Sequence, residues 1–362
     1  MNARSRTFHR IAVTGVALAA LTIGAGVPAA LAAPAPASAA SAAHGGRAVA
    51  QDPVAMRELL ARLPDGVSTS ALVRLSGKGL RAPWTGSAGP VAAEAGAPIG
   101  SVTKLFTDTL VLRLAAEHRI AVDAPVRHYL PDLIPAGYAE VTVRQLMDHT
   151  GDLPMVSGGP AEPREVVLAS FAADAAARPG RVPAPGTVQQ YNGMNSFVAG
   201  LLVERISGRT YEEELRRQIL RPLGLRQTGM STDPRMAWYW AEGGLVSTAA
   251  DLDRFITALL GGRLLPPAQQ RHLYEVPDVP NSPTNTCLSP KACFSAGGLM
   301  RHEAGGTTVW GKTGSGLGRS SGVFATGDGG RRLVYAYTPA AGATRTQQVN
   351  RVVELVNAGF AG

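Results

Sequence analysis

Ser101 and Lys104 are the residues of this chain whose types and spacing most directly suggest chemistry. They stand in the stretch Ser-Val-Thr-Lys, directly before an apolar run that begins at Leu105. A spacing of three residues places both side chains on one face of a helix, one turn apart. The lysine amine can then take the proton of the serine hydroxyl and activate the serine as a nucleophile. A lone S-x-x-K is more commonly an ordinary helix start with a surface lysine, so this hypothesis depends on further motifs.

The apolar residues that follow Lys104 predict the helix that must position this pair. Their spacings of three and four are typical of a helix with one apolar face, formed by Leu105, Phe106, Thr109, Leu110, Leu112 and Leu114. A serine in the first turn lies where free N–H groups and the positive end of the helix dipole favour negative charge. The N–H of Ser101 is therefore predicted to form half of an oxyanion hole.

Two further segments carry candidate site residues. Lys312-Thr313-Gly314 follows a predicted strand, 307–310, and offers a cation and a hydroxyl to an anionic substrate group, while the glycine allows close approach. Tyr191 precedes a predicted helix, and a phenol with a pKa near ~10 can relay protons once nearby cations lower that pKa. Each feature alone is more commonly structural: a glycine-rich hairpin with a solvated lysine, or a packed aromatic ring.

Taken together and in this order, S-x-x-K, a tyrosine and K-T-G resemble the serine beta-lactamase and DD-peptidase family. The likeness runs from about Pro53 to the C-terminus and includes family-like stretches outside the three motifs: 146–150, 185–187, 222–225 and 243–248. Several motifs in the correct order are far more specific than one. Within that family, the chain is most similar to class C beta-lactamases and to exported D-alanyl-D-alanine carboxypeptidases.

The resemblance implies a role for each motif residue: acylated nucleophile for Ser101, base for Lys104, proton relay for Tyr191, and substrate carboxylate binding for Lys312 and Thr313. It also implies that the backbone N–H of Ser315 is the second oxyanion donor. A lysine base near neutral pH requires the pKa of Lys104 to fall by ~3 units from ~10.4. Burial beside a second cation such as Lys312 is predicted to cause that fall.

One position departs from the family pattern. The family's second motif is Y-x-N, whereas Tyr191-Asn192-Gly193 has glycine in the third place. In the family that asparagine holds the lysine and the substrate amide, so both tasks lack an assigned residue. Asn192 or Asn195 is the predicted substitute, if the loop turns differently. Without a substitute, loss of a hydrogen bond to a charged partner costs ~1.5–3 kcal/mol and slows acylation without abolishing the site.

The distribution of predicted elements indicates an α+β fold. Helical spacing at 53–63 and strand-like alternation from Ser70 precede a mostly helical middle, and strands return after Cys293 before a closing helix at 346–357. The middle helices are predicted at 142–149, 165–176, 197–206, 210–220 and 248–260. We therefore predict an antiparallel sheet flanked by N- and C-terminal helices, with a large all-helical insertion. The expected lobes are 51–120 with 290–362, and 121–289.

The N-terminus has the features of an export signal. Three arginines precede an apolar stretch, 11–27, and small residues suited to signal-peptidase cleavage follow. We expect a signal peptide at 1–39, a flexible leader at 40–50, a secreted protein and no stable membrane span after cleavage. Removing residues 1–39 takes away three arginines and no acidic residue, so the formal net charge falls from +8 to +5. That small surplus gives little reason to expect a nucleic-acid partner.

Other motifs in the chain are weaker. Residues 306–313 spell the phosphate-binding G-x-x-x-x-G-K-T and 318–322 spell G-x-S-x-G, but the first lies on a predicted strand and the second has no histidine after it. His302-Glu303 lacks the second histidine of a zinc helix, and His149 is interpreted as structural. No metal and no cofactor are expected. Cys287 and Cys293 are predicted to form a small local disulfide.

The sequence therefore favours an exported acyl-serine hydrolase. The leading function is a D-alanyl-D-alanine carboxypeptidase that acts on peptidoglycan stem peptides. A beta-lactamase or an esterase on the same scaffold is a close alternative, and a catalytically weakened relative that only binds peptidoglycan or penicillin is the alternative of a different class. Retention of Ser101, Lys104, Tyr191 and Lys312 favours catalysis, whereas Gly193 favours the weakened form.

Overall fold

Segments from both ends of the chain build the main sheet. The computed structural model describes residues 52–91, 96–157, 159–285, 287 and 289–361. Six strands lie in the order β2-β1-β9-β8-β7-β6, with bounds Trp84–Ala88, Ser68–Gly77, Arg331–Pro339, Arg319–Thr326, Thr307–Gly316 and Met300–Ala304. Every neighbouring pair is antiparallel. The predicted α+β class with an antiparallel sheet is confirmed.

Both faces of this sheet are covered. Successive side chains of a strand point to opposite sides, so a strand with apolar residues at neighbouring positions contributes to two cores. In β8 and β9, Phe324 and Leu333 belong to the core under the terminal helices, whereas their neighbours Val323 and Val334 belong to the other core. The terminal helices are α1, Val54–Ala61, and α13, Arg345–Phe360, which pack together. The opposite face is covered by α11, Ala249–Leu260, which contacts β1, β8 and β9.

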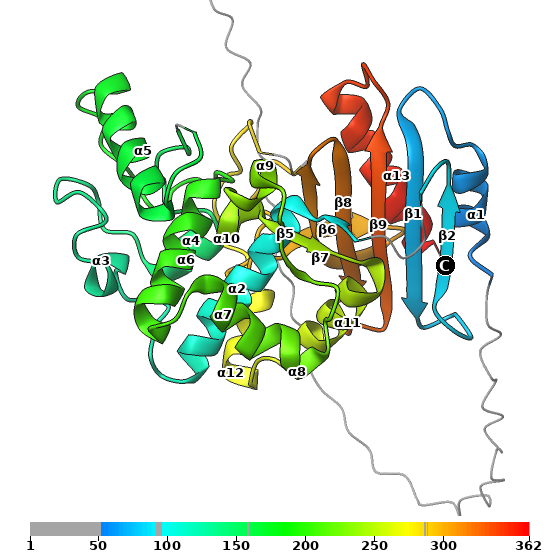
Figure 1. Ribbon diagram of the computed structural model, residues 1–362, viewed down its shortest axis with the longest axis horizontal. Helices are drawn as coiled ribbons and strands as arrows, with labels where there is room; N and C mark the ends of the chain where they lie inside the picture. Colours follow the sequence, from blue (N-terminus) through cyan, green and yellow to red (C-terminus); the bar gives the residue numbers. More distant parts are fainter. Residues whose placement is uncertain (1–51, 92–95, 158, 286, 288, 362) are drawn as a thin grey trace, which may run out of the picture. The chain divides into compact units, whose positions relative to one another are not determined.

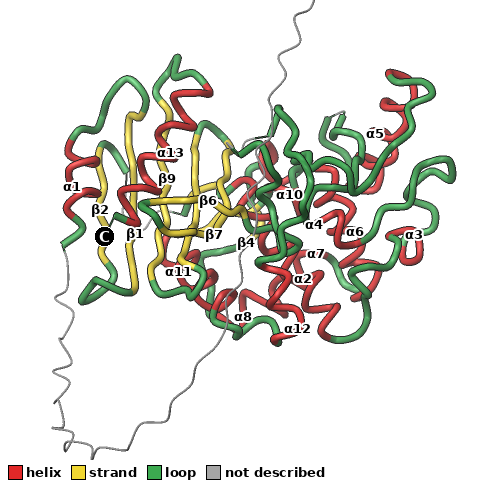
Figure 2. Tube along the Cα trace, turned by 180° about the vertical axis from the view of Figure 1, so that it is seen from behind, coloured by secondary structure: helices red, strands yellow, loops and turns green. Residues whose placement is uncertain are grey.

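Helices make up most of the region beside the sheet, as Figure 1 shows for α2 to α10 and Figure 2 shows from behind. Their bounds are α2 Thr103–Ala116, α3 Val126–Tyr129, α4 Val143–Met147, α5 Pro163–Ala177, α6 Gly193–Ser207, α7 Tyr211–Leu215, α8 Arg221–Leu223, α9 Pro234–Ala237, α10 Trp240–Gly243 and α12 Pro267–Gln270. Short 3₁₀ turns lie at Gly100–Val102 and Arg271–Leu273, and a π-helical turn lies at Arg216–Leu220. A second sheet has the order β3-β5-β4, with bounds Ala97–Pro98, Leu245–Ser247 and Gly229–Met230.

Local sequence signals place several helix ends correctly. Thr210 and Glu213 form the predicted capping box at the start of α7. Gly208 ends α6 with a left-handed φ of 71°, a conformation that glycine adopts without steric cost. The helix predicted over 210–220 changes to π geometry after Leu215. The spacing of apolar residues does not predict that change in hydrogen-bond register.

Helix α2 lies at the centre of the larger core. Twelve of its fourteen residues are buried, including Lys104 and Asp108. It packs against α6, α7, α10 and α12, so its surroundings are protein on nearly every side. The single apolar face predicted from the sequence therefore understates the burial of this helix. Its first turn meets β7 through the 3₁₀ turn at Gly100–Val102, and this meeting point positions the candidate site.

Some predictions concern residues outside the described ranges, and one remains a prediction. The signal peptide, 1–39, and the leader, 40–50, fall outside the described residues. The division into lobes at 51–120 with 290–362 and at 121–289 stays a prediction. Within the described ranges, we find no helix that combines the length and the apolar character required to cross a membrane.

Candidate active site

Ser101 lies in the 3₁₀ turn that leads directly into α2. The sequence predicted that Ser101 opens the α-helix itself, but the tighter turn comes first, because Gly100 has a left-handed φ of 48°. Lys104 remains close to the serine despite this difference: its Nζ lies 3.4 Å from Ser101 Oγ. The lysine side chain is buried, whereas Ser101 is half-buried and lines a hollow. The nucleophile is thus open to a substrate and the ammonium beside it is shielded from water.

Strand β7 carries the K-T-G residues alongside the turn that holds Ser101. The sequence placed this motif after the strand, whereas β7 continues through it to Gly316. A Cβ added to Gly314 would lie 2.0 Å from the carbonyl oxygen of Ile99, so only glycine allows the strand to approach this closely. Ser321 Oγ donates to the same carbonyl at 3.0 Å. This contact brings the Ser315 backbone next to Gly100. The pair of oxyanion donors stays a prediction.

Lys312 is the second buried cation of the site. Its side chain is 1% exposed, and its Nζ donates to the carbonyl of Thr313 at 3.0 Å. The ammonium also lies 4.5 Å from the centroid of the Tyr191 ring. Burial, assisted by the charge of Lys104, lowers the pKa of Lys312 below its ordinary value. None of the ion pairs among the described residues includes Lys312. A substrate carboxylate would give this lysine a negative partner.

Tyr191 lies between the two ammonium groups. Lys104 Nζ is 5.2 Å from the ring centroid on one side, and Lys312 approaches from the other. The phenol oxygen is buried, and Ser101, Lys104 and Lys312 are the polar groups that interact with it. Burial raises the pKa of Tyr191, but the two cations outweigh this effect and lower it. This shift favours the phenolate, which is the form of Tyr191 that can act as a base.

The rings of His149 and Phe294 pack against the ring of Tyr191. Their ring centroids lie 4.6 Å and 5.1 Å from that of Tyr191. Burial and the nearby lysines lower the pKa of His149 well below its ordinary value, so it is neutral. Its Nδ1 pairs with Asn195 Nδ2 at 2.9 Å. These contacts are structural, in line with the interpretation of His149 from sequence.

Lys104 does not show the electrostatic behaviour predicted for it. Its ammonium donates to the backbone carbonyl of Glu242 at 2.8 Å and forms an ion pair with the carboxylate of the same residue. Burial lowers the pKa of Lys104, but Glu242 and Tyr191 outweigh burial and raise it above the ordinary value. The predicted fall of this pKa is therefore wrong, because the carboxylate of Glu242 stabilises the ammonium form of Lys104. In the resting site Lys104 is a cation, and its charge favours the Tyr191 phenolate.

Glu242 fills the space that the missing asparagine of the second motif would need. A Cβ added to Gly193 would lie 2.6 Å from Glu242 Oε2 and 2.9 Å from its Cδ. Sequence reasoning overlooked Glu242, although it directly precedes the family-like stretch that begins at Gly243. The sequence signal that could have indicated such a residue is Gly193. Glycine at the third position of the motif cannot bind Lys104, so a buried lysine there needs another hydrogen-bond partner.

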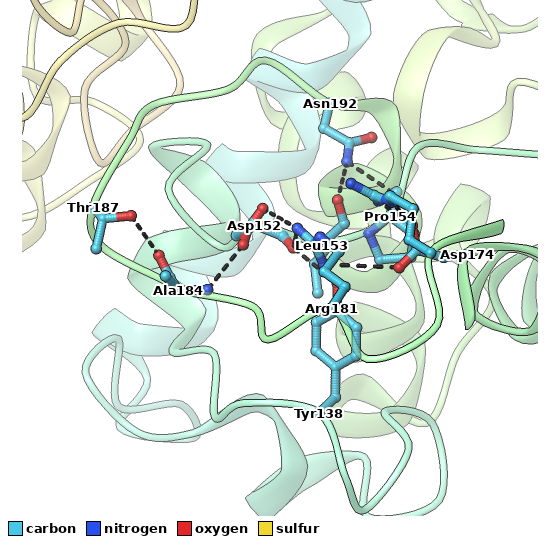
Figure 3. A network of polar contacts seen from close by, with 10 residues as sticks. Tyr138, Asp152, Leu153, Pro154, Asp174, Arg181, Ala184, Thr187 and Asn192 are labelled. Atoms are coloured by element: carbon cyan, nitrogen blue, oxygen red, sulfur yellow. Dashed lines mark hydrogen bonds and ion pairs between the residues drawn. The ribbon is translucent and has the colours of Figure 1, made fainter. Parts of the chain in front are cut away.

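Asn192 and Asn195, the predicted substitutes, are both turned away from Lys104. Asn192 caps α6 by accepting from the N–H of Met194, and its Nδ2 donates to the carbonyls of Leu153 and Pro154 at 2.8 and 2.9 Å (Figure 3). Asn195 is paired with His149. Both side chains are buried. Neither side chain lines either of the hollows at Ser101, and Asn192 and the Nδ2 of Asn195 are hydrogen-bonded to the segment that follows α4.

Arg181 holds that loop in place from the opposite side, as Figure 3 shows. Its guanidinium donates to the Tyr138 hydroxyl at 2.7 Å and to the Asp152 carbonyl at 3.1 Å, and it also pairs with the Asp152 carboxylate. Asp174 lies 3.8 Å away. The second carboxylate oxygen of Asp152 accepts from the N–H of Ala184. These contacts connect the segments around residues 138, 152 and 181–184.

Two adjoining hollows open onto Ser101. The larger one has a volume of about 860 Å³ and is lined by Tyr191, Lys312 and Thr313 together with residues of β8 and α13. The smaller one, of about 520 Å³, is lined by Gly193, Glu242 and Tyr239. Both also include Ser315. A substrate can therefore place its carboxylate side in the first hollow and its acyl side in the second.

The remaining motifs have structural explanations. The G-x-x-x-x-G-K-T spelling lies along β7, an antiparallel strand, and not in a loop between a strand and a helix. The G-x-S-x-G spelling lies at the start of β8. Cys287 and Cys293 form the predicted disulfide. Across the described ranges, we find no group of three or more His, Cys, Asp or Glu side chains arranged to hold a metal ion.

The site combines an accessible serine beside a buried lysine with a phenol between two ammonium groups and a strand edge at the nucleophile. These features define an acyl-transfer site on an α+β fold. The beta-lactamase family model matches residues 56–357. The chain belongs to the beta-lactamase family, and with it to a group of serine hydrolases.

Individual relatives span several activities. Penicillin-binding protein 4 of Amycolatopsis lactamdurans is 30% identical over 190 residues, which cover 43% of this chain and 48% of that protein. Esterase EstB of Burkholderia gladioli is 33% identical over 153 residues, covering 38% and 39% of the two chains. The chain thus spans about half the length or less of these curated relatives. Among solved structures, a D-stereospecific amidohydrolase from a Streptomyces species is 28% identical with a TM-score of 0.69, covering 83% of this chain and 98% of that one.

Proposed function

We propose that this protein is an exported serine hydrolase that acts as a D-alanyl-D-alanine carboxypeptidase on peptidoglycan stem peptides. The observation that carries the proposal is that Ser101, Tyr191 and Lys312 line one hollow, with the buried Lys104 Nζ 3.4 Å from Ser101 Oγ. The similarity to a penicillin-binding protein and to a D-stereospecific amidohydrolase supports a D-configured acyl group. Export is proposed from the N-terminal sequence.

Acylation begins with binding of the terminal carboxylate. Lys312 and the Thr313 hydroxyl hold this carboxylate, which places the scissile carbonyl at Ser101. The Tyr191 phenolate takes the proton of Ser101 as Oγ attacks the carbonyl carbon, and the backbone N–H groups of Ser101 and Ser315 stabilise the oxyanion. Tyr191 then returns the proton to the leaving amine of the last D-alanine as the C–N bond breaks. Lys104 stays protonated and stabilises the phenolate electrostatically.

Deacylation uses water as the second nucleophile. The phenolate of Tyr191 removes a proton from the water while its oxygen attacks the acyl-enzyme carbonyl. Collapse of the tetrahedral intermediate breaks the ester bond, and Tyr191 returns the proton to Ser101 Oγ. The products are free D-alanine and a stem peptide shortened by one residue. The speed of this second half distinguishes a carboxypeptidase, which holds penicillin as a durable acyl-enzyme, from a beta-lactamase, which releases it.

The test combines peptide hydrolysis with penicillin labelling. Purified protein is incubated with diacetyl-L-lysyl-D-alanyl-D-alanine, and release of D-alanine is measured beside Ser101→Ala. A fluorescent penicillin then follows labelling and its loss over time. We expect D-alanine release and durable label for the wild type and neither for Ser101→Ala. Rapid turnover of the drug without peptide cleavage would replace the carboxypeptidase with a beta-lactamase, and binding without acylation would indicate the weakened relative.

A further inference from the structure

The side chain of Glu242 fills the space that is left empty by the absence of a side chain at Gly193. Glycine at 193 leaves a gap at the start of α6, and the carboxylate of Glu242 reaches into it from α10. The virtual Cβ of Gly193 lies 2.6 Å, 2.9 Å and 3.2 Å from Glu242 Oε2, Cδ and Oε1. Any larger side chain at 193 would therefore displace the carboxylate. The two positions form one compensating pair, although they are far apart in the sequence.

The position of Glu242 is determined by the backbone around it. Thr107 of α2 donates to the carbonyl of Ala241 at 2.6 Å, and the N–H of Glu242 donates to the carbonyl of Tyr239 at 2.9 Å. Trp240 has a left-handed φ of 42°, which is uncommon for a residue other than glycine. Its ring packs against Tyr211 with the centroids 5.2 Å apart. A strained turn held by buried contacts thus presents the carboxylate to the site.

The two oxygens of this carboxylate have different surroundings. Oε2 pairs with the Lys104 ammonium, whereas Oε1 has no hydrogen-bond partner within the described portion of the chain. The Glu242 side chain is 17% exposed and lines the smaller hollow together with Ser101. One oxygen is therefore available to a molecule that occupies this hollow beside the nucleophile.

The chemistry of a carboxylate differs from that of an asparagine amide in one decisive respect. An amide both donates and accepts hydrogen bonds, whereas an ionised carboxylate only accepts them. Lys104 only donates, so it always takes an oxygen. An asparagine would then present its NH₂ group to the substrate, but Glu242 presents an acceptor. The preferred substrate group is consequently reversed from a carbonyl to an N–H.

We propose that Glu242 replaces the third residue of the second motif, both as the positioning residue for Lys104 and as an acceptor for an N–H on the acyl side of the substrate. This inference rests on the proposed function, whose D-alanyl acyl group carries such an N–H on its α-nitrogen. An acyl group with oxygen in that place turns lone pairs toward the carboxylate. It is therefore a poorer substrate, although its reacting carbonyl is the same.

A matched pair of thioesters isolates this single contact. One is an N-acyl-D-alanyl thioester, and the other is the O-acyl-D-lactyl thioester, in which oxygen replaces the N–H. Acylation rate constants of the full-length mature protein are measured by release of the thiol. A hydrogen bond to a charged partner corresponds to a preference of roughly tenfold or more. We expect the wild type to favour the N–H compound by at least about tenfold.

Three variants and one control variant test the role of Glu242. In Glu242→Gln the amide must turn its oxygen to Lys104 and its NH₂ to the substrate, so the preference should fall below about threefold or reverse. Glu58→Gln, at an exposed position of α1, should keep the wild-type ratio. Glu242→Ala should acylate roughly tenfold or more slowly. Adding Gly193→Asn to Glu242→Ala should recover most of that loss, because it restores the Y-x-N motif, provided that circular dichroism shows a folded protein.

The outcomes separate this inference from the proposed function. A wild-type preference near one, or an unchanged preference in Glu242→Gln, overturns the role of Glu242 whether or not the peptide is cleaved. A clear N–H preference that Glu242→Gln removes, together with no D-alanine release from the peptide, overturns the carboxypeptidase and supports the role of Glu242. If neither thioester acylates the wild type, both proposals fail.

Discussion

Gly100 and Ser315 lie backbone to backbone at the point where the nucleophile turn meets strand β7. A Cβ added to Gly100 would lie 2.2 Å from the Ser315 carbonyl oxygen and 2.7 Å from its nitrogen. Gly100 also has a left-handed φ of 48°. The absence of a side chain at position 100 is therefore what lets the Ser315 N–H reach the neighbourhood of Ser101.

Substitution of Gly100 should separate the two proposed oxyanion donors. Gly100→Ala introduces both a steric clash and backbone strain, for which we expect a destabilisation of about 1–3 kcal/mol. A displacement near 1 Å at a reacting centre slows the reaction about 100-fold, so penicillin acylation should fall by roughly that factor. Gly66→Ala is the matched control, because nothing lies within 4 Å of its Cβ. Acylation of Gly100→Ala at the wild-type rate would contradict this assignment.

The pH dependence of acylation should report on Tyr191. The two lysines lower the pKa of Tyr191 although burial opposes them. Because the phenolate is the active form, acylation should rise as pH increases through a pKa below the ordinary value of 10.0. Tyr191→Phe should remove this rise and reduce the acylation rate by about 10²–10⁴-fold. Stopped-flow acylation between about pH 5 and 10 measures both effects, and a retained rise in Tyr191→Phe would exclude Tyr191 as the base.

Protein stability should depend on the protonation of Asp148. Burial raises the pKa of Asp148 from 3.8 to about 6, although Thr150 donates two hydrogen bonds to its carboxylate. The folded state therefore binds this proton more tightly than the unfolded chain does. The free energy of unfolding should fall by about 2 kcal/mol as pH rises from about 4 to about 6, out of about 3 kcal/mol over the whole titration.

Asp148→Asn is the control for that prediction. The amide keeps an oxygen that can accept from Thr150 but has no proton to lose in this range. Urea unfolding at several pH values should show a much flatter profile for the variant than for the wild type. Equal slopes for both proteins would assign the pH dependence to other groups.

Loss of Arg181 should loosen the loop that Asn192 also holds. Arg181→Ala leaves the Tyr138 hydroxyl and the half-buried carboxylate of Asp152 without their cation, and we expect a loss of about 1–3 kcal/mol in stability. Arg178→Ala removes a half-exposed guanidinium from its i,i+4 ion pair with Asp174, which keeps Arg181 nearby, and should cost about 0.5 kcal/mol or less. Thermal unfolding compares the two variants. Equal melting temperatures would show that the network in Figure 3 contributes no measurable stability.

Local patterns in the sequence predicted many of the helices and their ends. The capping box at Thr210, the left-handed Gly208 and the apolar spacing of the middle helices each depend on residues within about one turn. Such signals do not depend on the rest of the molecule. Strand β6 and the three-stranded sheet went unpredicted, because short strands are defined by their pairing partners and not by their own residues.

The order and identity of the motifs were likewise present in the chain, and they sufficed to select Ser101, Lys104, Tyr191 and Lys312 from the sequence alone. What only the tertiary structure decided is the charge state of Lys104. That state depends on Glu242, a residue 138 positions away, whose carboxylate reaches Lys104 through the gap at Gly193. Electrostatic interactions depend on distance in space and on burial, and neither quantity is written in the spacing of residues along a chain.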